Sequence, residues 1–276
     1  MPYVDIIGGQ LWTRTEGAGE DVMLIAGLGD DGSAWEAQVD ALARRFRVTV
    51  LDNRGTGRSS APPPPWTVCD LARDALAVLD GLGIAAAHVV GSGLGAAAAQ
   101  ELAAAAPARV RSLVLNGSWV RADAPFRSLV QSWIAAAEQA GSLSEVLAVI
   151  ALSVTPSALD AAWMIDRRLD AVDGDHALGD ATACAAFIAA AEAALAYDAG
   201  DRLGTIGGPT LLTAGEIDEV LGLDHCRAVA SAIPHAETAV FRGCGHQPFQ
   251  EDPAGFNGLA GEFLAAAGAA GRAVAA

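Results

Sequence analysis

The chain has 276 residues, and 52% of them are hydrophobic, which suits one large α/β domain with an insertion or two small domains. Its formal net charge of −16 argues against nucleic acid or a membrane surface as partner, because an acidic protein repels phosphate groups. The sequence has no long apolar run and no signal-peptide pattern, and its four scattered cysteines are expected to be free thiols. We therefore expect a cytoplasmic protein. A homo-oligomer is possible, and the sequence does not decide it.

Short apolar segments alternate with helical segments along most of the chain. The first predicted strands, 3–7 and 10–15, form an antiparallel hairpin. Six further strands are predicted at 22–26, 47–51, 87–90, 110–115, 210–213 and 238–241. Helices are predicted at 34–43, 68–82, 96–105, 221–232 and about 253–267, the last followed by a tail that we expect to fray. This alternation is typical of a doubly wound, mostly parallel, eight-stranded α/β sheet flanked by helices.

The stretch from 121 to 200 interrupts this alternation. It is rich in alanine, has helical periodicity and contains no convincing strand. We therefore expect an α/β core made of residues 1–120 and 201–276, with a helical cap inserted after the sixth strand. Such a cap would cover the carboxyl edge of the sheet, where ligands bind in open α/β folds. Trp119, Trp133 and Trp163 are candidate substrate-binding side chains, although such aromatic residues can equally pack the cap against the core.

The segment Gly91-Ser92-Gly93-Leu94-Gly95 leads from a predicted strand directly into a predicted helix. It has the outer glycines and the setting of the nucleophile elbow G-x-S-x-G, in which a strained turn lifts a nucleophile above the sheet. The central residue is Gly93, which has no side chain. The alternative motif, the dinucleotide-binding loop G-x-G-x-x-G, requires glycine at position 96, where the chain has alanine.

Further motifs accompany this turn along the chain. A glycine loop occupies 24–29, a D-x-R-G-x-G-x-S turn 52–59, a strand with an acidic turn 209–218, and a histidine loop 243–253. In this order the motifs resemble those of the α/β-hydrolases, especially the capped enol-lactonases, carbon–carbon-bond hydrolases and cofactor-independent haloperoxidases. The resemblance covers essentially the whole chain outside the predicted cap, and it implies the α/β-hydrolase fold.

The resemblance also implies roles for single residues. His246 matches the catalytic base, and Asp218 matches the acid that orients it, with Glu216 and Glu219 as rivals in the same turn. No metal-ligand cluster and no cofactor fingerprint occurs in the sequence, so we expect neither a metal nor a cofactor.

The glycine loop and the elbow together match the family's oxyanion hole, which the backbone N–H groups of Leu28 and Leu94 would form. Main-chain donors tolerate a change of side chain, so Ala26 in place of the family's usual histidine does not remove them. At Gly93 the chain departs from the family, because without a side-chain oxygen no acyl-enzyme can form there.

Three hypotheses follow from Gly93. In the first, His246 and Asp218 act on a small hydrophobic carbonyl compound (an ester, lactone or polyketide-like molecule) by non-covalent acid–base chemistry, as a lyase, cyclase or water-using hydrolase. In the second, an ordinary serine hydrolase has had its serine replaced by glycine, which inactivates it. In the third, the fold serves a non-catalytic binding protein, which the retained histidine and acid argue against. Neither Ser92, predicted to face away from the base, nor Cys244 is expected to replace the serine.

Overall fold

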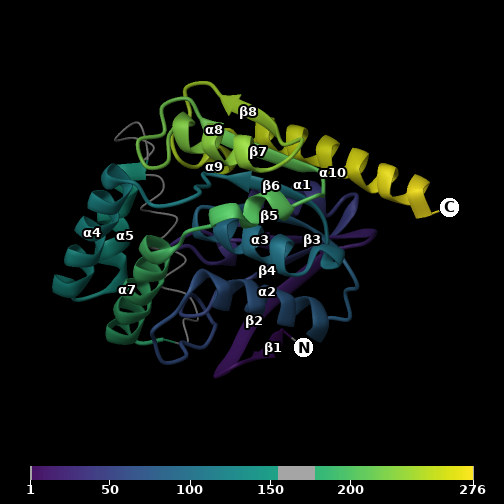
Figure 1. Cartoon of the computed structure of the whole chain (residues 1–276). Coiled ribbons are helices and arrows are strands. Elements are labelled where there is room, and N and C mark those ends of the chain that lie inside the picture. The colour runs from purple at the N-terminus through teal and green to yellow at the C-terminus, as the bar shows by residue number, and fades with distance from the viewer. Residues whose placement is uncertain (1, 155–177, 276) are drawn as a thin grey trace.

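The computed structural model describes residues 2–154 and 178–275. The described strands form one eight-stranded sheet in the order β1-β2-β4-β3-β5-β6-β7-β8. The strands are β1 Tyr3–Ile6, β2 Gly9–Gly17, β3 Glu20–Ile25, β4 Phe46–Leu51, β5 Ala87–Ser92, β6 Val110–Asn116, β7 Thr210–Gly215 and β8 Glu237–Phe241. β2 is antiparallel to β1 and β4, whereas all other neighbours pair in parallel (Figure 1). The predicted eight-stranded, mostly parallel fold is therefore confirmed.

The helices fill the connections between these strands. They are α1 Glu36–Leu42, α2 Val68–Gly81, α3 Leu94–Ala105, α4 Ala124–Gln139, α5 Leu143–Val154, α7 Asp180–Ala196, α8 Leu223–Ala232, α9 Pro248–Glu251 and α10 Pro253–Ala275, with 3-10 turns η1 Gly32–Trp35, η2 Pro107–Arg109 and η3 Gly200–Thr205. The start of α2 shows why a helix begins where it does. Thr67 accepts the N–H of Asp70, and the Asp70 carboxylate accepts the N–H of Thr67, so two otherwise unpaired amides are satisfied.

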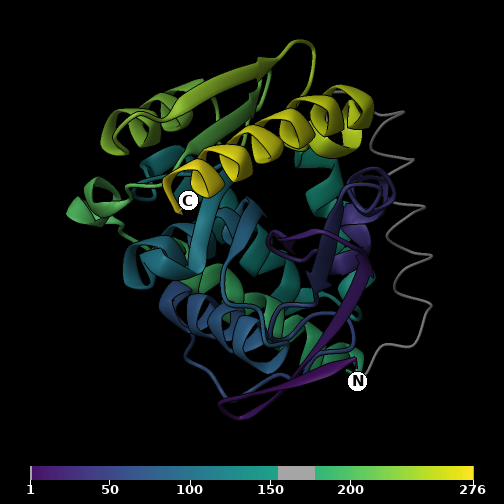
Figure 2. The same cartoon turned by 90° about the vertical axis from the view of Figure 1, so that its right-hand side faces the viewer.

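Both faces of the sheet are covered, which explains why its central strands are apolar throughout. In β3, Met23 and Ile25 belong to the apolar cluster that contains α2 and α3. Val22 and Leu24 point the other way and pack with η1, α1 and α10. Figures 1 and 2 show the sheet between α2 and α3 on one side and α10 on the other.

The helices α4, α5 and α7 lie between β6 and β7 in the chain and gather at one side of the sheet (Figure 1). They contact one another, and Trp133 of α4 and Phe187 of α7 share an apolar cluster with core residues of α3. An isolated bridge between Arg121 and Asp198 joins the two ends of this insertion. The helical insertion thus has the position that the sequence indicates, and its treatment as a separate cap of residues 121–200 stays a prediction.

The predicted helices differ from the observed ones at their ends, and the differences at three of them have physical reasons. The helix expected at 34–43 begins as the 3-10 turn η1 and continues as α1. The helix α8 starts at Leu223 because the amides of Val220 and Leu221 donate to the Asp218 carboxylate instead of entering a helix. The last helix, α10, continues past the predicted end at 267 to Ala275, as its alanines favour, and the expected fraying of the tail stays a prediction.

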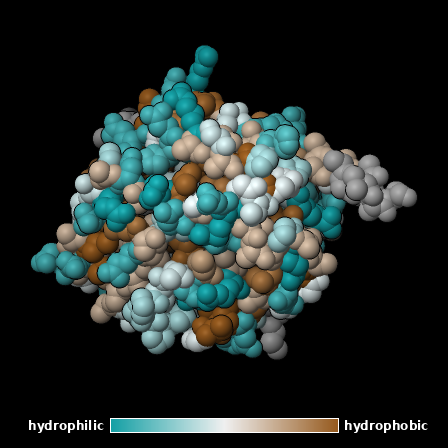
Figure 3. Space-filling view, viewed as in Figure 1, coloured by the Kyte–Doolittle hydropathy of each residue, from teal (hydrophilic) through white to brown (hydrophobic). Residues whose placement is uncertain are grey.

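Polar residues cover much of the face shown in Figure 3, where hydrophobic residues lie in small groups between them. Within residues 2–154 and 178–275, no helix is both long enough and apolar enough to cross a bilayer. The same ranges contain no group of three or more His, Cys, Asp or Glu side chains that could hold a metal ion. The cysteines Cys69, Cys184, Cys226 and Cys244 are free thiols, as predicted.

Candidate active site

The turn between β5 and α3 holds Gly93 at φ 53° and ψ −119°, a conformation that residues with a side chain rarely adopt. Gly95 serves a different purpose, because a Cβ there would lie 2.2 Å from the carbonyl oxygen of Ile25 and would push α3 away from β3. The space at Gly93 is open: a Cβ would be 3.8 Å from both Gly27 Cα and His246 Nε2. The turn therefore has the strained geometry of a nucleophile elbow without a nucleophile.

His246 lies in the loop between β8 and α9, and its Nδ1 is 2.9 Å from Asp218 Oδ2. Its Nε2 faces the space above Gly93. The backbone of His246 is held from two sides: its N–H donates to the carbonyl of Val154 at 3.2 Å, and its carbonyl accepts from Asn116 Nδ2 at 3.1 Å. The fold thus brings together the predicted base, the predicted acid and the predicted nucleophile position.

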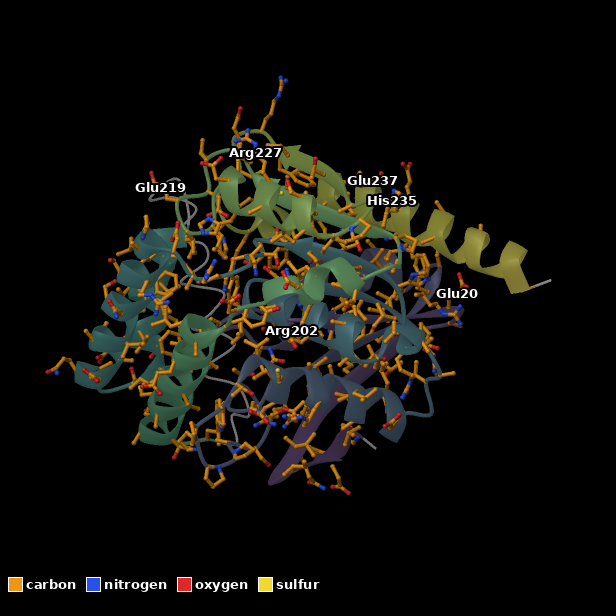
Figure 4. The ribbon with its side chains drawn as sticks, in the orientation of Figure 1. Glu20, Arg202, Glu219, Arg227, His235 and Glu237 are labelled. Atoms are coloured by element: carbon orange, nitrogen blue, oxygen red, sulfur yellow. The ribbon has the colours of Figure 1, made fainter. Side chains whose placement is uncertain are left out.

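The carboxylate of Asp218 is 1% exposed and accepts the N–H groups of two following residues at 2.8 and 3.0 Å. Burial by itself raises the pKa of this carboxyl, but the charge and hydrogen bond of His246 and the two amides together hold the pKa below its usual value. Glu216 and Glu219 are exposed instead, and Figure 4 shows Glu219 at the outer surface. Of the rival acids, Asp218 is therefore the one bonded to the histidine.

The charge around His246 favours its protonated form. Burial on its own lowers the pKa of the imidazole, because an imidazolium ion loses hydration. The charge and hydrogen bond of Asp218 outweigh that effect, and Asp30 and Glu251 add to it, so the pKa lies above the ordinary value of 6.5. The ring therefore binds a proton readily and acts as a free base only above that raised pKa.

Leu28 and Leu94 line the cavity beside this histidine. Leu94 is the first residue of α3, where a backbone N–H has no acceptor within its own helix. Leu28 lies in the glycine loop after β3, and neither amide donates to another group within the described part of the chain. Both N–H groups are therefore available to an oxygen of a bound molecule.

The cavity is small: about 40 Å³ of it is open to the centre of a water molecule. The inserted helices contribute Phe126, Trp133, Ile150, Val154 and Ala194 to its wall. Trp119 also lines it, and its Nε1–H is a buried donor with no acceptor among the described residues. Of the three candidate substrate-binding tryptophans, Trp119 and Trp133 line the cavity, whereas Trp163 lies outside the described residues. A mostly apolar wall with few polar groups is typical of a small-molecule site.

Two polar residues of the cavity escape the sequence analysis. Asp30 and Gln247 both line it and are only 6% and 4% exposed. Gln247 Nε2 donates to Asp30 Oδ2 at 3.0 Å. Asp30 follows the glycine loop directly and Gln247 follows His246 directly, so adjacency to the two motifs is the signal that points to them.

The two alternative nucleophiles are poorly suited to the reaction. The hydroxyl of Ser92 accepts from Asn116 Nδ2 at 3.1 Å in the interior of the protein. Burial, with the nearby charges of Glu251 and Asp252, raises the pKa of Cys244 to about 11, which leaves little thiolate at neutral pH. Both observations agree with the expectation that neither residue replaces the missing serine.

Comparisons with known proteins support the family assignment. The model of a family described as alpha/beta hydrolase fold matches residues 22–253. A putative carbamate hydrolase, RutD, from Azorhizobium caulinodans is 33% identical over 239 residues, which cover 87% of this chain and 89% of that protein. A hydrolase from Pseudomonas aeruginosa has a TM-score of 0.83 and 31% identity, covering 95% of this chain and 97% of the other. The enol-lactonase of Burkholderia xenovorans has a TM-score of 0.85 and 27% identity, covering 96% and 100%.

The fold, the order of the motifs and the family match agree with one another. The chain belongs to the α/β-hydrolase family. It is an enzyme of this family, like the relatives and structural neighbours that are hydrolases by name. This finding counts against the hypothesis of a non-catalytic binding protein.

Proposed function

We propose that the chain hydrolyses small carbonyl compounds and uses a water molecule in place of the serine that the family normally supplies. The observation that carries this proposal is the 3.8 Å separation between His246 Nε2 and the Cβ position of Gly93. Glycine leaves that space open, and a water molecule in it would lie within reach of a general base. A carbamate hydrolase and an enol-lactonase among the similar proteins support a carbonyl carbon bonded to a heteroatom as the reacting group.

In the proposed reaction, His246 Nε2 removes a proton from water while the water oxygen attacks the carbonyl carbon. Asp218 holds the imidazole in the required tautomer and stabilises the imidazolium ion that forms. The N–H groups of Leu28 and Leu94 bind the oxygen that becomes negatively charged. The raised pKa favours the first step, in which the imidazole takes the proton from water. The imidazolium then gives its proton to the leaving group as the tetrahedral intermediate collapses, which restores the neutral base.

The groups that remain can support substantial catalysis without a covalent step. A positioned general base contributes roughly 10²–10⁴-fold. An oxyanion hole together with binding retains about 10³–10⁴-fold over water in enzymes that lack triad members. We therefore expect a modest but measurable hydrolase activity.

The inserted helices serve, in this proposal, as a cap that selects the substrate. Trp119 and Trp133 form an apolar part of the wall, so the substrate is small and hydrophobic around its reacting carbonyl group. The residues 121–200 would then determine which ester, lactone or carbamate fits.

The test is the turnover of a panel of phenyl esters and phenyl carbamates by the unaltered chain and by His246→Ala. We expect His246→Ala to lower kcat/KM by about 10²-fold or more, because the general base is lost. His235→Asn is the matched control, since His235 is exposed (Figure 4). Its backbone is in the left-handed region, a conformation that asparagine also adopts. Unchanged turnover in His246→Ala would overturn the proposal.

Mass spectrometry during turnover distinguishes direct water attack from a covalent route. We expect no acyl adduct on the unaltered chain, because Gly93 offers no nucleophile. If the unaltered chain is inactive on every substrate and Gly93→Ser is active, the second hypothesis, a hydrolase that has lost its serine, is the correct one.

A further inference from the structure

The polar groups of the cavity form a pattern that the proposed function does not yet use. Asp30 and Gln247 are buried in a wall that is otherwise mostly apolar. A carboxylate in such a place is unusual, because burying a charge is unfavourable unless hydrogen bonds compensate it. The amide of Gln247 supplies one such bond, from Nε2 to Asp30 Oδ2 at 3.0 Å.

This hydrogen bond fixes the orientation of the Gln247 amide. An ionised carboxylate only accepts hydrogen bonds, so the NH₂ end of Gln247 must face Asp30 and the oxygen must face away. That oxygen, Oε1, is buried and has no hydrogen-bond donor among the described residues. The pair therefore presents two kinds of acceptor, a carboxylate oxygen and an amide oxygen, from residues that both line the cavity.

Asp30 and Gln247 lie near the position proposed for the reacting carbonyl group. A Cβ on Gly27 would lie 3.5 Å from Asp30 Oδ2, and a Cβ on Gly93 would lie 3.8 Å from Gly27 Cα. Gly27 is thus close to both the carboxylate and the space above Gly93, which places the acceptors near the reaction position. Electrostatic influence of Asp30 on His246 agrees with this proximity.

We propose that Asp30 and Gln247 recognise an NH₂ group attached to the reacting carbonyl carbon. The enzyme then prefers primary carbamates and primary amides to esters or ketones of the same shape. The two hydrogens of an NH₂ group match the two acceptors, while the Nε1–H of Trp119 and the amides of Leu28 and Leu94 are donors for oxygen atoms. A methyl group in the same place would offer no hydrogen to Gln247 Oε1, which would stay buried without a donor, and a site of this kind disfavours that strongly.

The inference rests on the proposed function for the placement of the carbonyl group, but its test needs no turnover. Benzamide and acetophenone share a ring and a carbonyl group, differ only in NH₂ against CH₃, and can be compared by isothermal titration. We expect benzamide to bind the unaltered chain about 10-fold or more tightly than acetophenone, the typical effect of hydrogen bonds to a charged group. A purely apolar cavity would instead prefer acetophenone, the more hydrophobic of the two.

The variants Asp30→Ala and Asp30→Asn test whether the carboxylate causes the preference. We expect the ratio of the two Kd values to fall to about one or below in Asp30→Ala and to fall less in Asp30→Asn, which keeps the shape of the side chain. Asp31→Asn is the matched control, because the carboxylate of Asp31 instead accepts the N–H of Ser33. If Asp30→Ala does not fold, the ratio in Asp30→Asn decides.

The inference is overturned if the unaltered chain binds acetophenone as tightly as benzamide, or if neither Asp30 variant changes the ratio of Kd values. His246→Ala separates this result from the proposed function. We expect this variant to lower kcat/KM by about 10²-fold or more and to keep the preference for benzamide. If turnover is unchanged in His246→Ala, the mechanism fails while the recognition site is still judged by the Kd ratio.

Discussion

Restoring the missing hydroxyl by Gly93→Ser tests the geometry of the whole site in one step. A Cβ at this position meets no atom closer than 3.8 Å, so the new side chain fits without displacing its neighbours. One further C–O bond can bring Oγ within hydrogen-bond reach of His246 Nε2, about 2.6–3.2 Å. The substituted chain should therefore form an acyl-enzyme with an activated ester.

The same substitution should reduce stability by an amount that follows from the backbone. Holding a side chain at φ 53° and ψ −119° costs about 1–3 kcal/mol. The reduced freedom of the unfolded chain returns about 0.4–1 kcal/mol. The difference is a net loss of up to about 2.6 kcal/mol, which lowers Tm by up to roughly 10 °C in a chain of this size.

The variant Gly93→Ala is the matched control, because it carries the same Cβ and the same strain without the hydroxyl. We expect both variants to lose a similar amount of Tm in differential scanning calorimetry. Only Gly93→Ser should release p-nitrophenol from p-nitrophenyl butyrate in a burst, at least about 10²-fold faster than Gly93→Ala. If both are folded and equally slow, His246 and the Leu28 and Leu94 amides are not arranged for acyl transfer, and the reasoning is refuted.

Further predictions concern the base, its position and a buried ion pair. His246 must be neutral to accept a proton, so kcat/KM should fall as the pH decreases through a pKa above 6.5. Asp218→Asn removes the contact that raises this pKa, so in this variant kcat/KM should fall at a lower pH. A pH–rate profile that is unchanged by Asp218→Asn would contradict this assignment. Gly117→Ala should lower kcat/KM by about 10²-fold, because the new Cβ would lie 2.7 Å from His246 Cε1 and displace the imidazole ring. Full activity of this variant in a steady-state assay would disprove the prediction. Asp74→Ala should destabilise the protein by about 3–5 kcal/mol in urea unfolding, because the guanidinium of Arg54, 2.7 Å from Asp74 Oδ2 and 7% exposed, would be buried without its partner. A loss below 1 kcal/mol would show that water or another group replaces the carboxylate.

Local patterns predict the fold of this chain well. The strands at 22–26 and 87–90 correspond to β3 and β5, because runs of apolar residues buried on both faces leave little choice of structure. The ends of helices are harder to predict, since tertiary contacts decide them. At α8, the Asp218 carboxylate takes two amides that the periodic pattern assigns to the helix.

The candidate site is predictable where motifs define it and hidden where distant segments meet. His246 and Asp218 are 28 residues apart and are found from two motifs in the family's order. Asp30 and Gln247 are 217 residues apart, and neither residue alone indicates a partner. Their pairing follows from the parallel sheet, which brings the loops after β3 and β8 to the same edge.

The hydrogen bond between the His246 N–H and the Val154 carbonyl makes the inserted helices part of the support of the general base. Replacing this insertion with that of a relative would therefore change more than the substrate range. The transplanted segment would also have to supply the carbonyl at the end of α5 that accepts the His246 N–H. Leu152, 65% exposed only two residues earlier, carries no such requirement. Libraries that recombine this insertion should keep the backbone of the last turn of α5 and vary its outward side chains, so that selectivity can change while the base stays aligned.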